Sequence, residues 1–179
     1  VVVARRDLAD NDRTIVRERL DQTRALVTSI AAEVGSTLDS ARAALAHIQA
    51  QPKPPQSLGD GRLMSCGAKL LLDGSGGART AWLYKDWNKN KTGVDTGNTG
   101  YPTIDPQVYR QQISLFHRAG VHVGTHAIGD QAIDWTVDTY AQALKEQPTH
   151  GLRHSIIHAN IPTDHAIDTM ASLQKQYDA

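Results

Sequence analysis

The chain has 179 residues, which is the length of one ordinary domain and enough to bury a hydrophobic core. Nineteen Lys and Arg residues balance nineteen Asp and Glu residues, so charge gives no reason to expect nucleic acid or an acidic membrane surface as a partner. A single cysteine excludes an intrachain disulfide framework, and no apolar run approaches the roughly 20 residues that cross a bilayer. The first residues, VVVARRDLADNDR, become charged after four positions, unlike a signal peptide, which favours a cytoplasmic location.

Residues 1–52 are predicted to form a helical region. Apolar residues recur at helical spacing on both sides of Gly35, which indicates two helices separated at that glycine. The second helix would begin at Ser36 or Thr37, either of which could cap it. The segment PKPPQSLGDG at 52–61 cannot continue a helix and is predicted to be a connector.

From residue 62 onward, the pattern changes to alternating strands and helices. Strands are predicted within 62–74, at 121–127 and at 151–159, and helices at 106–119, at 129–146 and from 162 to about 177. A long Gly- and Asn-rich loop at 74–105 separates the first strand from the first of these helices, and such loops usually have a function or are disordered. The alternation implies right-handed βαβ units, a parallel sheet and an α/β fold.

Chemistry-bearing side chains occur near the ends of all three predicted strands. Lys69 lies in the middle of the first strand and Asp73 at its end, while the second ends at His126 and the third at His158. Because ligands bind beyond the carboxyl ends of strands in parallel α/β folds, these residues are predicted to converge on one edge of the sheet.

Seven of the eight histidines lie between residues 117 and 165. His122 and His126 are four residues apart, as are His154 and His158, but four residues of strand span about 13 Å, which is too far to share a metal ion. The predicted chelate therefore runs across strands, from His126 to His158. His122 and His154 are expected to be hydrogen-bonding groups in the core.

Structural roles compete with these chemical ones. His117 and His165 lie within predicted helices and are expected to face solvent. A single histidine at a strand end is more often structural than a ligand, and Lys69 is expected at an edge or toward solvent because an unpaired buried ammonium is costly. The glycine-rich segment 73–80, DGSGGART, could bind a phosphate through backbone donors, but it contains no GKS or GKT sequence.

Three separated blocks of sequence together resemble one protein family. In chain order they are KLLLDGSGGARTAWL, HAIGDQAID and RHSIIHAN, and they resemble the YtcJ-like branch of the amidohydrolase superfamily over roughly residues 61–179. The resemblance implies that 62–179 form part of a (β/α)₈ TIM barrel, about its third to sixth strands. It also implies a metal-dependent hydrolase that cleaves amide-type C–N bonds of a small molecule.

The resemblance also implies roles for individual residues. Lys69 would be carboxylated and would bridge two divalent metals, commonly zinc, with His126 and His158 as further ligands. Arg79, Tyr84 and Asp130 fall within the matching blocks and are expected to bind substrate or to support the site. A metal-activated water would attack the scissile carbonyl in such an enzyme.

The sequence departs from the family pattern in three ways. No His-x-His pair occurs, the proton-shuttling aspartate expected after the last barrel strand would lie beyond this sequence, and Ile157 replaces the usual glutamate before the histidine of the last block. The 179 residues alone are therefore expected to have little hydrolase activity. The alternative is a non-catalytic α/β module or degenerate homologue that acts in binding or assembly, with self-association through open sheet edges.

Overall fold

A computed structural model describes residues 37–46, 56–58, 63–65, 67–87 and 97–179 of the chain. Two compact units divide the chain at residue 40, and the second unit, 41–179, holds the strands and the large helices. Residues 37–46 are helical and lie within the second helix predicted for the N-terminal region. The first predicted helix falls outside the described residues.

A small antiparallel pair of strands precedes the main sheet. Strand β1 (Gln56–Leu58) pairs with β2 (Leu63–Ser65), with Leu58 opposite Leu63. The prediction of a simple connector over 52–61 is therefore wrong for its last part. The three residues of β1 follow the final proline of that segment, so each retains a backbone N–H that can pair with a neighbouring strand.

The main sheet has three parallel strands in the order β3-β4-β5, which are β3 (Ala68–Leu71), β4 (Val123–Ala127) and β5 (Ser155–His158). The register places Leu71 beside His126 and Ala127 beside His158. Each strand falls inside a segment predicted from the sequence, and the parallel arrangement confirms the predicted βαβ order.

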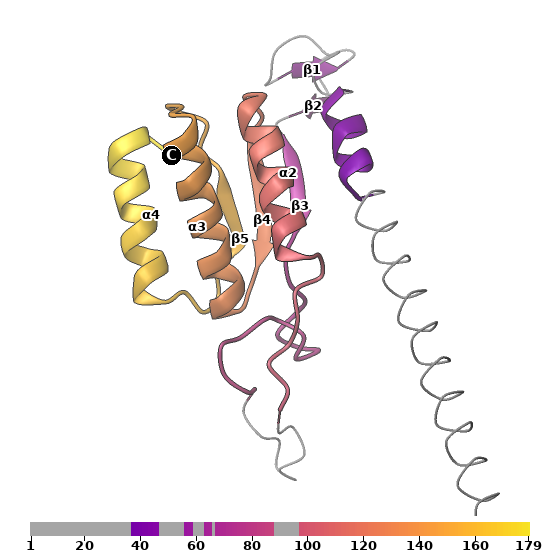
Figure 1. The fold of residues 1–179 in the computed structure, drawn as a ribbon, viewed down its shortest axis with the longest axis vertical. Coiled ribbons are helices and arrows are strands. Elements are labelled where there is room, and N and C mark those ends of the chain that lie inside the picture. The colour runs from indigo at the N-terminus through magenta and orange to yellow at the C-terminus, as the bar shows by residue number, and fades with distance from the viewer. Residues whose placement is uncertain (1–36, 47–55, 59–62, 66, 88–96) are drawn as a thin grey trace, which may run out of the picture. The chain divides into compact units, whose positions relative to one another are not determined.

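Three helices cover one face of this sheet, namely α2 (Pro106–Arg118), α3 (Asp130–Glu146) and α4 (Asp164–Tyr177) (Figure 1). Asp105 caps α2 by accepting hydrogen bonds from two N–H groups of its first turn, and Thr163 caps α4 by accepting from Ala166. Within the described residues, no helix is long and apolar enough to cross a membrane.

The core lies between these helices and the sheet. Its central strand, β4, contributes Thr125, which is fully buried and hydrogen-bonds the hydroxyl groups of Tyr109 (2.9 Å) and Tyr140 (2.7 Å). Burial raises the pKa of Tyr109 to about 12, so its hydroxyl stays protonated and available as a donor. These hydroxyls tie α2 and α3 to the same residue of β4.

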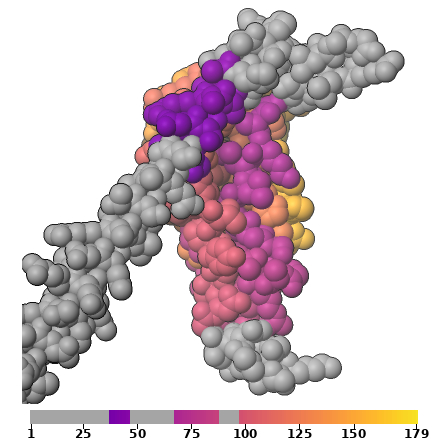
Figure 2. Space-filling model, turned by 90° about the vertical axis from the view of Figure 1, so that its right-hand side faces the viewer, coloured from indigo at the N-terminus to yellow at the C-terminus, as the bar shows by residue number. Residues whose placement is uncertain are grey.

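The opposite face of the sheet is open in the described residues. Lys69 is exposed there, and the Leu71 side chain is 54% exposed, which is unusual for a leucine on a parallel strand. Figure 2 shows β3 and the chain that follows it, in magenta, at the surface of the molecule. The prediction that Lys69 lies at an edge or faces solvent is confirmed.

A chain of histidines lies at the amino ends of the strands, and it overturns one prediction. His117 was expected to face solvent but is 1% exposed, because it lies on the side of α2 that packs toward the start of β5. Its Nδ1 lies 2.9 Å from Nε2 of His154, and its Nε2 lies 2.8 Å from the carbonyl oxygen of Gln147. His165, in contrast, is exposed on α4 as predicted.

One set of neutral tautomers satisfies all the hydrogen bonds of His117 and His154. The backbone N–H of Val123 donates to Nδ1 of His154, so His154 carries its proton on Nε2 and donates it to His117. His117 then carries its own proton on Nε2 and donates it to Gln147. Protonating His154 would place a second proton on Nδ1, where it would face the N–H group of Val123, and two donors cannot hydrogen-bond each other. Burial and the neighbouring imidazoles of His117 and His122 accordingly lower the pKa of His154 to about 3.

The free energy of unfolding should therefore fall with acidification. The pKa of His154 is about 3 in the folded state and near 6.5 when unfolded, so only the unfolded state takes up this proton between those values. The stabilisation is complete above pH 6.5 and falls by about 1.4 kcal/mol for each pH unit below it. A His154→Gln variant should lose this part of the pH dependence, as measured by urea unfolding at several pH values.

The control for this experiment is His165→Gln on the surface of α4. The Asp138 carboxylate raises the pKa of His165, so any stabilisation from that pair is present at low pH and lost as the pH rises. Parallel stability curves for the wild type and the His154→Gln variant would contradict the assignment to His154.

Candidate metal centre at the carboxyl edge of the sheet

Two histidines meet at the carboxyl ends of neighbouring strands. The rings of His126, on β4, and His158, on β5, lie edge to face with their centroids 4.6 Å apart. Lys69 projects from the same open face as His126, since it lies two residues before Leu71, the partner of His126 on β3. The structure thus brings the two imidazoles together. Lys69 lies on the same face as His126, two residues nearer the start of the strands.

The backbone of His158 departs from regular strand geometry. In a regular pleat His158 would share the helix-covered face with Ala127, its partner on β4. Its φ is instead 85°, and that of Ala159 is 46°, so two successive non-glycine residues have left-handed backbones. The ring of His158 consequently lies against that of His126 at the open edge, and such backbone strain is concentrated at functional sites in proteins.

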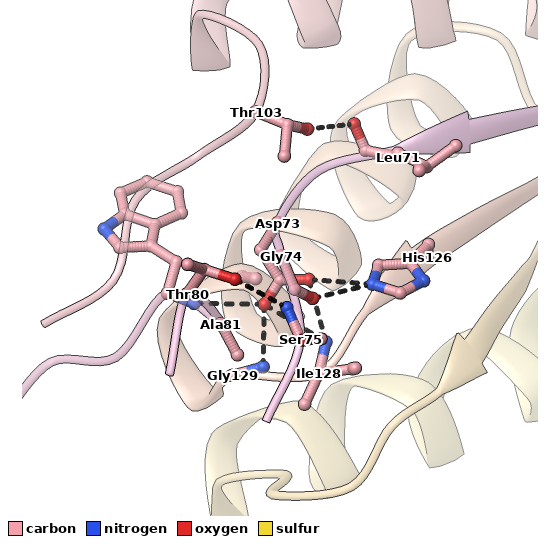
Figure 3. A network of polar contacts seen from close by, with 12 residues as sticks. Leu71, Asp73, Gly74, Ser75, Thr80, Ala81, Thr103, His126, Ile128 and Gly129 are labelled. Carbon is pink, nitrogen blue, oxygen red and sulfur yellow. Dashed lines mark hydrogen bonds and ion pairs between the residues drawn. The ribbon is translucent and has the colours of Figure 1, made fainter. Parts of the chain in front are cut away.

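The buried carboxylate of Asp73 joins several backbone segments beside His126 (Figure 3). Asp73 follows β3 and is 1% exposed. Its oxygens accept hydrogen bonds from the backbone N–H groups of Trp82 (3.1 Å), Ile128 (3.1 Å) and Gly129 (2.9 Å). One side chain therefore joins the end of β3, the loop after it and the turn between β4 and α3.

Helix α3 begins in this same turn. Its N-cap, Gly129, has no side chain to cap the helix, and the first-turn N–H group of Ala132 donates instead to the carbonyl oxygen of Trp82 at 3.3 Å. A Cβ atom on Gly129 would lie 2.0 Å from that same oxygen, so this close approach requires glycine. The Asp73 carboxylate also lies at the positive end of the helix dipole.

The glycine-rich loop at 74–80 closes on itself. The N–H groups of Thr80 and Ala81 donate to the carbonyl oxygen of Ser75, and that of Ser75 donates to the Thr80 hydroxyl. Ala78 likewise donates to the Ser75 hydroxyl. A phosphate cradle needs such donors to point at the ligand, so the phosphate hypothesis gains no support from this geometry.

The three predicted substrate residues have structural contacts. The Asp130 carboxylate accepts a hydrogen bond from the backbone N–H of Tyr84 at 3.0 Å, and the Tyr84 hydroxyl donates to Asp134, also at 3.0 Å. Burial and the Asp134 carboxylate raise the pKa of Tyr84 to about 12. Arg79 has a φ of 55° and its carbonyl oxygen accepts from Asn98. Tyr84 and Asp130 thus anchor the loop to α3, and their substrate roles stay predictions.

The donor set at this edge suits a metal ion in one respect and is incomplete in another. His126 donates from Nε2 to the carbonyl oxygen of Gly74 at 2.8 Å, which is the support that metal-ligating histidines usually have on their second nitrogen. In the part of the chain that the structure describes, however, no group of three or more His, Cys, Asp or Glu side chains is arranged to hold an ion. His126, His158 and Lys69 can supply only part of a ligand set.

Asp73 was predicted from the sequence as one of the charged groups at this edge, but its role in joining the backbone segments was not. The signal was an acidic residue between a buried strand and a glycine, a position where a parallel fold brings loops together. Its three backbone partners lie 9, 55 and 56 residues away in the chain, so local patterns could not identify them.

The parallel βαβ arrangement places both imidazoles at the carboxyl edge of the sheet, where α/β folds of this kind carry their functional sites. Residues 9–179 match the model of the amidohydrolase family, and the chain belongs to that family. The family part of the resemblance seen in the sequence is therefore confirmed.

Known proteins similar to this chain are much longer than it is. The chain is 31% identical over 94 residues to Protein LONG AFTER FAR-RED 3 of Arabidopsis thaliana, a match that covers 52% of this chain and 15% of that protein. It also resembles two uncharacterized metal-dependent hydrolases of known crystal structure. The Pyrococcus furiosus protein is 29% identical, with a TM-score of 0.52 over 66% of this chain and 23% of that one. The Pyrococcus horikoshii OT3 protein is 26% identical, with a TM-score of 0.56 over 73% and 24%.

Substituting Gly129 should loosen the whole carboxyl edge. In a Gly129→Ala variant the new Cβ would meet backbone atoms of Trp82, which no rotamer change can relieve, so the loop must move away from α3. We expect the free energy of unfolding to fall by about 2–3 kcal/mol in urea titrations. Gly77→Ala is the control, since nothing lies within 4 Å of a Cβ there, and equal losses in the two variants would contradict the assigned role of Gly129.

Proposed function

We propose that this chain forms part of the metal centre of a YtcJ-like amidohydrolase, within a (β/α)₈ barrel, that hydrolyses amide-type C–N bonds of a small molecule. The observation that carries the proposal is the contact between His126 and His158 at the carboxyl ends of adjacent parallel strands. Family membership and the likeness to metal-dependent hydrolases support it. The strained backbone of His158 adds support, because it turns that ring toward His126.

Each residue would have a distinct role in such a centre. His126 and His158 would hold a divalent metal, with zinc the first candidate because neutral imidazole is among its usual ligands. When bound, the metal supplies an activated water and a polarised scissile carbonyl. Asp73 and Gly74 would keep the ring of His126 in place from below.

Lys69 would act as a carbamate. Its neutral amine nitrogen would add to the carbon of CO₂ and release one proton, which gives an anion with two oxygen donors. Lys69 is exposed on the open face that it shares with His126, so CO₂ can reach the amine. The resulting anion is a ligand for divalent cations, whereas the ammonium form is not.

A small molecule is the proposed substrate class, because the balanced charge of the chain gives no reason to expect nucleic acid as the substrate. One cleft of about 260 Å³, lined by Tyr140, Leu144, His154 and Met170, lies on the helical side of β5, away from the carboxyl edge. We place the substrate above His126 and His158, because the active sites of parallel βα folds lie beyond the carboxyl ends of the strands.

Removing either imidazole should weaken metal binding strongly. In the purified protein, His126→Ala and His158→Ala should each lower zinc affinity by ~100-fold or more, because the loss of a direct ligand exceeds the 10–100-fold cost of losing its support. The measurements are zinc content after dialysis and calorimetric titration with zinc. His165→Ala, which removes an exposed imidazole on α4, is the control. Unchanged zinc binding in both test variants would favour the non-catalytic α/β module instead.

Carboxylation of Lys69 can be tested separately. Protein equilibrated with zinc and ¹³C-labelled bicarbonate should show a carbamate signal in its carbon NMR spectrum. The signal should disappear in Lys69→Arg, because the guanidinium stays protonated and cannot add to CO₂. It should persist in Lys145→Arg, which changes a lysine in the last turn of α3. A signal that survives in Lys69→Arg would contradict the assignment.

A further inference from the structure

The ring of His126 is held from one side by the turn that follows β3. Its Nε2 lies 2.8 Å from the carbonyl oxygen of Gly74 and 3.6 Å from Oδ1 of Asp73, and its side chain is only 15% exposed. A carbonyl oxygen can only accept a hydrogen bond, so Nε2 must carry the proton. A neutral imidazole with its proton on Nε2 has its free lone pair on Nδ1.

The Asp73 carboxylate reinforces this choice of tautomer. It is immobilised by the N–H groups of Trp82, Ile128 and Gly129, so Oδ1 has a fixed position beside the ring of His126. A negative charge 3.6 Å from Nε2 favours an N–H bond at that nitrogen and disfavours a lone pair there. Both groups that face Nε2 in Figure 3 are thus acceptors.

The other nitrogen of His126 differs from those of the buried histidine chain. In His154 both ring nitrogens are used within the protein, Nδ1 by the N–H of Val123 and Nε2 by His117. Nδ1 of His126 has no hydrogen-bond partner among the residues that the structure describes. A ring that is fixed through one nitrogen and free at the other is prepared to bind something at the free one.

We infer that Asp73 and the Gly74 carbonyl form a positioning pair that locks His126 in its Nε2-protonated tautomer and so presents the Nδ1 lone pair at the open edge. The inference deepens the proposed function and rests on it for the identity of the ligand, a divalent metal. Asp73 acts here through His126 and is a positioning residue.

Asp73→Asn tests the inference with little change of shape. The amide oxygen can still accept from Trp82 and Gly129 in the place of Oδ2, but the amide nitrogen then occupies the place of Oδ1 and turns a donor toward Nε2 of His126. We expect the population of the Nδ1-protonated tautomer to rise. The zinc dissociation constant should increase 10–100-fold, as for other losses of support behind a metal-ligating histidine.

The tautomer is measured directly in metal-free protein. Long-range ¹H–¹⁵N correlation spectra of ¹⁵N-histidine-labelled protein at mildly alkaline pH should show His126 of the wild type protonated on Nε2. Comparison with His126→Ala assigns the signals. Asp134→Asn is the matched control, since Asp134 is also buried (6% exposed). Its carboxylate accepts hydrogen bonds from Tyr84 and Thr163 and makes none with His126. It should lower stability and leave the His126 signals unchanged.

The outcomes separate this inference from the proposed function. A wild-type His126 protonated on Nδ1 would overturn the positioning role even if zinc binds. An Nε2-protonated His126 in a protein that binds no zinc would uphold the positioning role and remove the proposed metal centre. Equal spectra and zinc affinities for the wild type and Asp73→Asn would overturn the role of Asp73. If Asp73→Asn does not fold, the wild-type spectrum alone decides between the two tautomers.

Discussion

The carboxylate of Asp73 is the constraint on which the carboxyl edge of this domain depends. It is buried, and its three backbone donors come from the loop after β3 and from the turn that starts α3. A buried charge is tolerated only when hydrogen bonds replace its water shell, and here three backbone N–H groups provide them. The same carboxylate lies 3.6 Å from His126. The same side chain therefore joins the backbone segments of this edge and supports a candidate metal ligand.

The two ends of the sheet use histidine in opposite ways. At the amino ends, His117 and His154 are bonded through both ring nitrogens, and protonating His154 would break the chain of hydrogen bonds. At the carboxyl ends, His126 is bonded through one nitrogen and lies against His158 at an open edge. This division agrees with the general behaviour of parallel βα folds, in which the bottom of the sheet provides stability and the top provides function.

Much of the fold was predictable because βαβ units follow local rules. Periodicity and glycine or proline boundaries located every strand of the parallel sheet and all three helices that cover it. His126 and His158 were predictable as a pair from the order of the strands. The burial of His117 was not, because a residue within a helical pattern takes its exposure from whatever packs against it. Nor was the role of Asp73, whose partners are distant in sequence.

The way α3 begins has a consequence for how this edge assembles. At the start of α3, Asp130 accepts from the neighbouring Gln131, but the N–H groups of Gly129 and Ala132 donate to Asp73 and Trp82, about fifty residues earlier in the chain. Closing so long a loop costs entropy, which these contacts and the pairing of β3 with β4 must offset together. The start of α3, the turn after β3 and the support of His126 then form one cooperative unit. A ligand held by His126 would stabilise that unit as a whole and would thereby act as a folding cofactor for the top of the sheet.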